Sequence, residues 1–423
     1  MESPKTICRW CTYWFAIMLC LNTFISKAYS QQQTLTLNEA VANTLEHNPL
    51  LFRFTYIEQG LLEQRKNSEL SPALSVEVEV ENISNTGMDD FTDGSELTLA
   101  LSSTIELGGT RKARMAIADA NMSLAQFEQQ SQTLDVLGAV TTAFIEGMAT
   151  QNLLVVAHEQ IAIAKTVLAS INKRAQSGAA SESEVMRARA TLTEAEIHFD
   201  ALAEVFQRRK ITLASYWGET NPDFARLQGS LNTFSKQNSF ENLYKRAIDS
   251  PAIQAFASQT RLKEAELKLA LAKNRSDINW RVGIQHFEET GESAFTGALS
   301  VPLFSKRRNT GNIKSILADR KAMDYQQQDA LIQLHTQLYH AYSLYQQNVN
   351  AVKRIDTELL PTLEKALDLT RDAYERGRDR SQDLFSAQQT LLQAKQSRIE
   401  TAKIALISQV LIEQLTGQSL GKL

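Results

Sequence analysis

The sequence predicts an α+β membrane protein with internally duplicated long α-helical hairpins plus four β-strands per chain. The first of three observations is a duplication, because a set of residues between Gly178 and Gly218 recurs 199 positions later, with one Glu-to-Asp change. The second is helical periodicity in two very long segments, and the third is strict alternation of polar and apolar residues in four short ones. The repeated pairs are Gly178/Gly377, Glu184/Asp383, Thr191/Thr390, Leu192/Leu391, Ala195/Ala394 and Gly218/Gly417.

A period of this length is far above the roughly 20–50 residues of a solenoid repeat, so it indicates duplication of a half-molecule. The sequence therefore predicts a first structural repeat over residues 31–220 and a second over 221–423. Each repeat has the same order: a short helix, a helix, two strands, a very long helix, a tight turn and a returning helix.

Residues 1–30 read as a secretory signal peptide. Lys5 and Arg9 form a basic start, an apolar stretch runs from Trp14 to Phe24, and Ala28-Tyr29-Ser30 is a small-residue cleavage pattern. Two alternatives are an N-terminal anchor helix and a lipidation site at Cys20.

Composition excludes several function classes. All three cysteines lie within residues 1–30, so the remaining chain has no thiol for catalysis or for a cysteine metal site. The formal net charge is −4, which is not that of a nucleic-acid binder. The sequence has no phosphate loop, nucleophile motif or paired catalytic carboxylate, and we expect no enzyme, no cofactor and no metal site. The six histidines are scattered, and His335 and His340 are expected to be surface or packing residues.

In the first half, helices are predicted over 37–47, 50–69, 110–176 and 182–217. Pro49 separates the first two helices, and Gly178 ends the third, as glycine commonly does at a helix C-terminus. Apolar and small residues at spacings of three and four mark one face of the long helix, as a coiled assembly requires.

In the second half, helices are predicted over 238–250, 251–275, 308–374 and 382–416. Pro361 falls inside the third pattern and should kink it. At 1.5 Å per residue, a helix of about 67 residues spans roughly 100 Å, which two stacked shorter helices match. The helices therefore predict a long rod, and the alternative is an isolated coiled-coil stalk.

Four segments alternate as strands do: 75–81, 97–102, 278–285 and 295–301. This pattern is typical both of a transmembrane barrel and of a soluble sheet with one buried face. No amphipathic layer remains to cover a soluble sheet, whereas three copies would close a barrel of 12 strands without edges. Glu77, Glu79 and Glu81 should then line the lumen of the barrel. Trp280 would belong to a girdle of aromatic residues at the membrane interface. The acidic loops 84–94 and 287–293 should be solvated.

Several motifs in this order resemble the TolC-like outer-membrane efflux protein family. They are Leu35-Thr36-Leu37-Asn38-Glu39-Ala40 with Asn48-Pro49, Ile105-Glu106-Leu107-Gly108-Gly109 leading to Arg111, Val301-Pro302-Leu303-Phe304, and the Gly178 and Gly377 turns. The Glu-Leu-Gly-Gly-x-Arg form is similar to the heavy-metal cation efflux branch. The resemblance implies a homotrimer: a 12-stranded β-barrel in outer-membrane lipid, continued by a periplasmic α-barrel.

The same resemblance implies docking to a periplasmic adaptor protein and an inner-membrane efflux transporter. The turns at Gly178, Ser181, Gly377 and Ser381 are the expected docking positions. Ser381 is displaced by one residue relative to Ser181, and the second turn is basic.

The residues at the two turns are also the candidates for a pore constriction or gate. In a trimer, acidic residues beside them would form rings at a constriction that attract cations. The alternative is helix capping, because acidic residues after a turn favour the helix dipole. Nearby arginines would pair with these acids and hold the tip closed. The pore or gate candidates are Glu182, Glu184, Arg376, Arg378, Asp379, Arg380 and Asp383.

The resemblance thus implies an outer-membrane exit duct of a tripartite efflux system, exporting heavy-metal cations. One alternative is the same type of duct for drugs or secreted proteins. An alternative of a different class is a periplasmic coiled-coil structural or adaptor protein.

Overall fold

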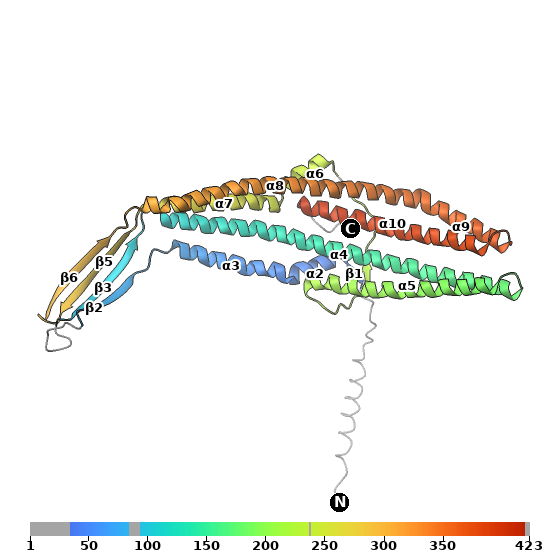
Figure 1. Ribbon diagram of the computed structural model, residues 1–423, viewed down its shortest axis with the longest axis horizontal. Coiled ribbons are helices and arrows are strands. Elements are labelled where there is room, and N and C mark those ends of the chain that lie inside the picture. The colour runs from blue at the N-terminus through green and yellow to red at the C-terminus, as the bar shows by residue number, and fades with distance from the viewer. Residues whose placement is uncertain (1–33, 84–93, 237, 419–423) are drawn as a thin grey trace, which may run out of the picture.

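The computed structural model describes residues 34–83, 94–236 and 238–418 of a long, gently curved molecule. Four strands lie at one end, and the turns of two helical hairpins lie at the other (Figure 1). The predicted signal peptide and the acidic residues Asp89, Asp90 and Asp93 lie outside the described residues.

The first half begins with two short helices and a pair of strands, followed by a long hairpin. Its elements are α2 (Leu37–His47), α3 (Pro49–Glu69), β2 (Ser75–Glu81), β3 (Glu96–Ile105), α4 (Thr110–Gln176) and α5 (Glu182–Ala214). A 3₁₀ turn, Ser215–Trp217, ends α5, where the sequence predicted three more residues of helix. All six predicted elements are present within a few residues of their predicted bounds.

The second half repeats this order of elements. They are α6 (Phe240–Ile248), α7 (Pro251–Ala272), β5 (Ile278–Phe287), β6 (Glu292–Ser300), α8 (Ser305–Arg354), α9 (Leu360–Glu375) and α10 (Ser381–Leu415). The boundary between the two structural repeats near residue 220 stays a prediction.

The predicted kink at Pro361 takes the form of a π-helical turn, Ile355–Leu359, between α8 and α9. Pro361 has no N–H to donate to the carbonyl of Thr357, four residues earlier. A π turn is one way in which a long helix absorbs such a break.

Local chemistry fixes the helix ends. Thr36 and Glu39 form a reciprocal capping box at α2, and the backbone N–H of Thr36 lowers the pKa of the Glu39 carboxyl. The Asn48 side chain caps α3 by accepting from the N–H of Leu50 at 2.9 Å. Gly178 and Gly377 adopt left-handed backbone angles, φ 74° and 71°, which explains why glycine recurs in both turns.

The four strands form one antiparallel sheet in the order β2-β3-β5-β6. Val78, Leu99 and Ile284 are aligned across it, as are Glu79, Thr98 and Gln285 on the opposite face. The predicted loop 287–293 is shorter in the structure, because Phe287 ends β5 and Glu292 begins β6. Glu292 therefore belongs to the sheet, which corrects its placement in a loop.

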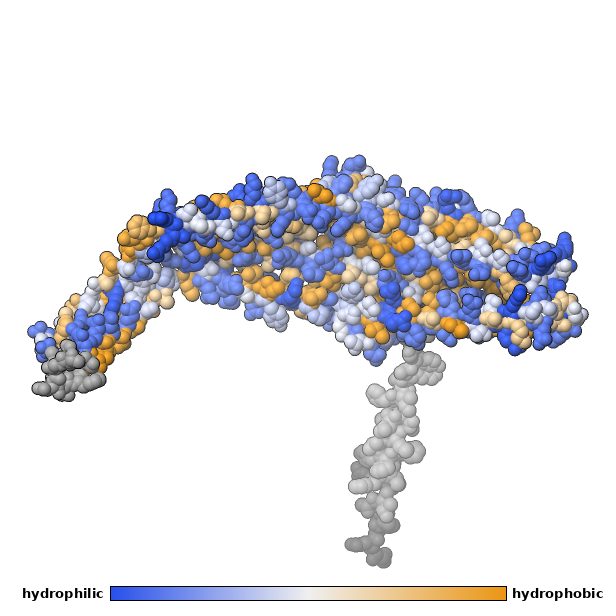
Figure 2. All heavy atoms as spheres, viewed as in Figure 1, coloured by the Kyte–Doolittle hydropathy of each residue, from blue (hydrophilic) through white to orange (hydrophobic). Residues whose placement is uncertain are grey.

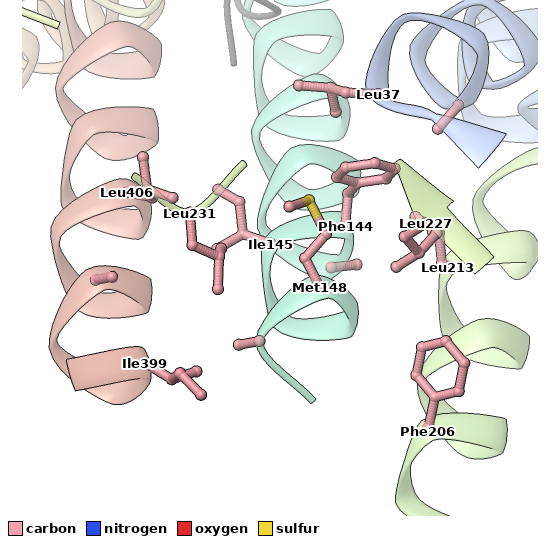
Figure 3. Close-up of a cluster of buried hydrophobic side chains, with 14 of the residues drawn as sticks. Leu37, Phe144, Ile145, Met148, Phe206, Leu213, Leu227, Leu231, Ile399 and Leu406 are labelled. Carbon is pink, nitrogen blue, oxygen red and sulfur yellow. The ribbon is translucent and has the colours of Figure 1, made fainter. Parts of the chain in front are cut away.

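The main core lies where the two halves meet, near the middle of the rod. Phe144, Ile145 and Met148 of α4 pack among side chains from α5, α10 and the segment after α5 (Figure 3). The sequence analysis missed a short parallel pair here, β1 (Thr34–Thr36) with β4 (Arg226–Gln228). The Gln151 side chain holds β4 through both its oxygen and its nitrogen, at 2.9 and 3.0 Å from the backbone of Leu227.

Two further apolar clusters lie away from this main core. One joins α6, α7, α8 and α10 and contains Leu338 and Tyr345, and the other lies toward the turns and contains Ile171 and Leu384. His335 packs edge-on against Phe240, as expected of a packing histidine. Among the described residues, α4 is long and apolar enough to cross a membrane. Core helices of soluble proteins meet the same criterion, so this is weak evidence for a membrane-spanning helix.

Gly283 offers a sharp test of the sheet. A Cβ at this position would lie 2.7 Å from the Leu99 carbonyl oxygen and 2.8 Å from the Ala100 Cβ. Gly283→Ala should therefore destabilise the folded protein by about 1–3 kcal/mol, the usual cost of overpacking. The measurement is the folded fraction on heat-modifiability gels.

The matched control is Gly297→Ala on the neighbouring strand, where the nearest atom to a new Cβ is 3.9 Å away. Both changes restrict a strand glycine in the same way. Equal losses of folded protein would contradict the close packing of β3 on β5.

Candidate functional site

One face of the sheet is apolar and open. Val76, Phe295 and Leu299 are exposed by 70%, 91% and 75%. No helix among the described residues covers this face, and Figure 2 shows hydrophobic residues along the end of the molecule that holds the strands. The same face carries Val78, Val80, Leu97, Leu99, Leu101, Val282 and Ile284. An apolar surface of this extent in water is costly and marks an interaction with another apolar phase.

The opposite face is polar. Glu77, Glu79 and Glu81 all lie on it, as their alternation predicted, and Thr98 and Ala100 between the larger side chains are almost fully buried. Whether these glutamates line a lumen stays a prediction. The sequence analysis missed their partner, Arg281 of β5, which forms ion pairs with Glu77 and Glu79.

The helical tips are built by capping. Ser181 and Glu184 form a capping box at the start of α5, with the Ser181 N–H donating to Glu184 at 3.1 Å. Asp383 accepts from the backbone N–H of Arg380 at 3.1 Å at the start of α10. The capping alternative is therefore confirmed for Glu184 and Asp383. A role in the pore for these residues stays a prediction.

Contacts between the two hairpins tie their turns together. The Ser381 hydroxyl donates to the second oxygen of Glu184 at 3.0 Å. Arg174 of α4 donates to the Tyr374 carbonyl at 3.1 Å, and its guanidinium lies 4.6 Å from the Tyr374 ring centre. The partners are about 200 residues apart, so only the duplicated turns hinted that they meet.

Within one copy of the chain, the arginines of the second turn do not pair with these acidic residues, and pairing between the copies of a trimer stays a prediction. Arg376 pairs with Asp372, one helical turn earlier in α9, at 2.7 Å. Within residues 34–83, 94–236 and 238–418, no ion pair joins Arg378 or Arg380 to Glu182, Glu184 or Asp379. The side chains lie on a solvated tip, where an exposed arginine gains most from the nearest carboxylate of its own helix.

The two arms of the second hairpin meet at the π-helical turn. Arg398 of α10 donates to both oxygens of Asp356, at 3.0 and 3.1 Å, and also to the Asn232 side chain. Its side chain is only 15% exposed. The pair lies between the main core, which includes Ile399, and the tip cluster, which includes Leu363. It is therefore placed where the tip region joins the middle of the rod.

Part of the chain matches a known protein family. Residues 65–219 match the family described as outer membrane efflux protein. The cobalt-zinc-cadmium resistance protein CzcC of Cupriavidus metallidurans is 25% identical over 300 residues, which are 70% of this chain and 71% of that protein. The nickel and cobalt resistance protein CnrC of the same species is 20% identical over 253 residues, 59% of this chain and 60% of CnrC.

A third relative is the pyoverdine export outer membrane protein OpmQ of Pseudomonas putida. It is 21% identical over 321 residues, which are 70% of this chain and 65% of OpmQ.

Solved structures share the fold. Crystal structures of CusC match with a TM-score of 0.78 at 14% identity, covering 90% of this chain and 92% of that one. The outer membrane protein VceC of Vibrio cholerae matches with a TM-score of 0.74 at 17% identity, covering 91% and 96%. The predicted TolC-like fold is confirmed.

The link between the two turns gives one prediction. Glu184→Ala removes both the capping acceptor and the partner of Ser381, so the first turn of α5 should lose about 1 kcal/mol of local stability. Hydrogen exchange of the amides in residues 181–186 measures this loss. Glu182→Ala is the control, because it removes a charge from the same turn without touching the capping box. Equal exchange in the two variants would contradict the link.

The pair of Arg398 with Asp356 at the π-helical turn gives a second prediction. Arg398→Gln should destabilise the region where α8 meets α9 by about 1.5–3 kcal/mol, the range for hydrogen bonds to charged groups. Faster hydrogen exchange over residues 352–367 is the expected result.

The control is Arg354→Gln in the same segment. Arg354 lies 3.7 Å from Glu358, but its side chain is 77% exposed, so this pair should contribute only about 0–1 kcal/mol. If exchange in Arg354→Gln were as fast as in Arg398→Gln, the pair of Arg398 with Asp356 would have no special role.

Proposed function

We propose that this chain is a member of the outer membrane efflux protein family and forms the exit duct of a tripartite efflux system that exports heavy-metal cations. The observation that carries the proposal is the open apolar face of the sheet at one end of a long helical rod. Outer-membrane lipid is the apolar phase that this face requires. Lipid-facing strands with a polar opposite face are the pattern of outer-membrane barrels.

The proposed assembly is a homotrimer. The sheet order leaves β2 and β6 as its two edges, each with unpaired backbone groups. Four strands do not close a barrel, but β6 of one copy pairing with β2 of the next would close a ring of 12 strands in three copies. The helices of the three copies would continue this ring as a periplasmic α-barrel.

The long helices set the reach of the duct. At 1.5 Å per residue, α4 with its 67 residues extends roughly 100 Å from the sheet toward the tips. The tips are therefore the part that would meet a periplasmic adaptor protein and the inner-membrane transporter that supplies energy. Gly178, Ser181, Gly377 and Ser381 are the proposed docking positions, since they lie in the two turns.

The same tips are the proposed gate. Three copies of each turn would place Glu182, Glu184, Asp379 and Asp383 around one axis, where rings of carboxylates favour cations. Glu184 would then have two roles, because the same carboxylate also holds the two turns together.

The cargo is proposed from the relatives whose names specify metal resistance. CzcC is named for cobalt, zinc and cadmium, and CnrC for nickel and cobalt. Within the described residues, no group of three or more His, Cys, Asp or Glu side chains is arranged to hold a metal ion. A duct of this kind would conduct hydrated cations handed over by its partners.

A second candidate is export of a small organic molecule. OpmQ, which is named for pyoverdine export, covers as much of this chain as CzcC does, at slightly lower identity. The fold and the proposed trimer are the same for both cargoes.

Deletion of the gene in its host tests the cargo. We expect growth to become sensitive to zinc, cobalt, cadmium or nickel, with unchanged sensitivity to dyes, detergents and antibiotics. Complementation with the intact gene should restore tolerance, and Gly297→Ala should restore it equally. Sensitivity limited to organic compounds would contradict the metal proposal and favour the second candidate.

A further inference from the structure

The polar face of the sheet carries an uneven set of charges. Among the described strand residues it holds five carboxylates and a single guanidinium, that of Arg281. His286, the other basic residue in these strands, lies on the apolar face by its register with Leu97. The carboxylates are Glu77, Glu79, Glu81, Glu96 and Glu292.

These charges are sorted along the strands. Glu81, Glu96 and Glu292 fall on one rung at the far end of the sheet from the helices. Arg281 lies near the other end, aligned with Ser102 and Ala298. The far rung is therefore acidic, whereas the part nearer the helices contains the balancing cation.

Arg281 reaches its partners across an intervening strand. It starts on β5 and passes over β3 to Glu77 and Glu79 on β2, with its Nε 3.4 Å from Glu77 and one terminal nitrogen hydrogen-bonded to Glu79. Small residues make room for it, since Ala100 and Gly283 lie on the same face. Ser102 donates to Glu77 at 2.5 Å and fixes that carboxylate further.

The guanidinium and its partners lie beside open space. The guanidinium borders a cavity of about 370 Å³ that Ser75, Glu77, Ser102 and Asn279 also line. Glu77 and Glu79 remain nearly half exposed, so their charges act on ions in this space and are not buried.

We propose that Arg281 is a charge-selectivity determinant of the duct, because it offsets one of the two negative charges of Glu77 and Glu79 and so limits the cation preference of the four-stranded sheet. The inference rests on the proposed function, since it requires the polar face to line a conducting lumen. In a trimer three copies of the Arg281 cluster would face one axis and act together.

The experiment is a reversal-potential measurement on the purified full-length protein in planar lipid bilayers under a potassium chloride gradient. Arg281→Gln should raise the ratio of potassium to chloride permeability by at least about two-fold, because the loss of one positive charge per copy attracts potassium and repels chloride at the same time. Glu79→Gln should lower the ratio, and the double variant Glu79→Gln with Arg281→Gln should return it near the wild-type value.

A purely structural role predicts something different. If Arg281 served only to strap β2 to β5, Arg281→Gln would lower the yield of folded protein and leave the permeability ratio unchanged. Arg281→Lys keeps the charge but loses the guanidinium geometry, so under the proposal it should retain wild-type selectivity.

The outcomes separate this inference from the proposed function. If the wild-type protein forms no channels, the duct itself is contradicted. If it forms channels whose ion selectivity is the same in wild type, Arg281→Gln and Glu79→Gln, the duct stands and the role of Arg281 is overturned. If Arg281→Gln does not fold, the permeability ratio of Glu79→Gln tests the proposal. An unchanged ratio in that variant would still overturn the role of Arg281 in charge selectivity.

Discussion

The apolar face of the four-stranded sheet is the constraint on which the rest of the structure depends. Its valines, leucines and Phe295 have no covering layer among the described residues, which is why we propose that lipid covers that side. The alternating register then forces Glu77, Glu79 and Arg281 to the other side. Once the sheet is fixed in a membrane, the long helices have to extend from one side of it, and the turns become the most distant point.

The rod itself is held by separate interactions along its length. The main core around Phe144 joins the two halves at the middle, and a smaller apolar cluster around Ile171 and Leu384 joins the hairpins near the tips. Polar contacts mark the transitions, with Arg398 and Asp356 between the two clusters and Glu184 with Ser381 at the turns. A structure built in segments allows the tips to rearrange while the middle of the rod stays packed.

Sequence reasoning predicted the elements well because each carries a strong local signal. The helix α4 was predicted at its observed bounds, since periodicity marks its length and Gly178 marks its end. The strands β1 and β4 were missed because three residues each are too short to show a period. The ion pairs of Arg281 and the contact of Glu184 with Ser381 were also missed, because they depend on register between segments about 200 residues apart.

The mass of the protein extracted in detergent from the outer-membrane fraction tests the central claim most directly. Native mass spectrometry should give three copies of the chain, because a ring of three pairs the free edges of β2 and β6 in the proposed 12-stranded barrel while the apolar face meets lipid. A monomer recovered from the soluble periplasmic fraction would contradict the account, since its apolar strand face would then have to be stable in water.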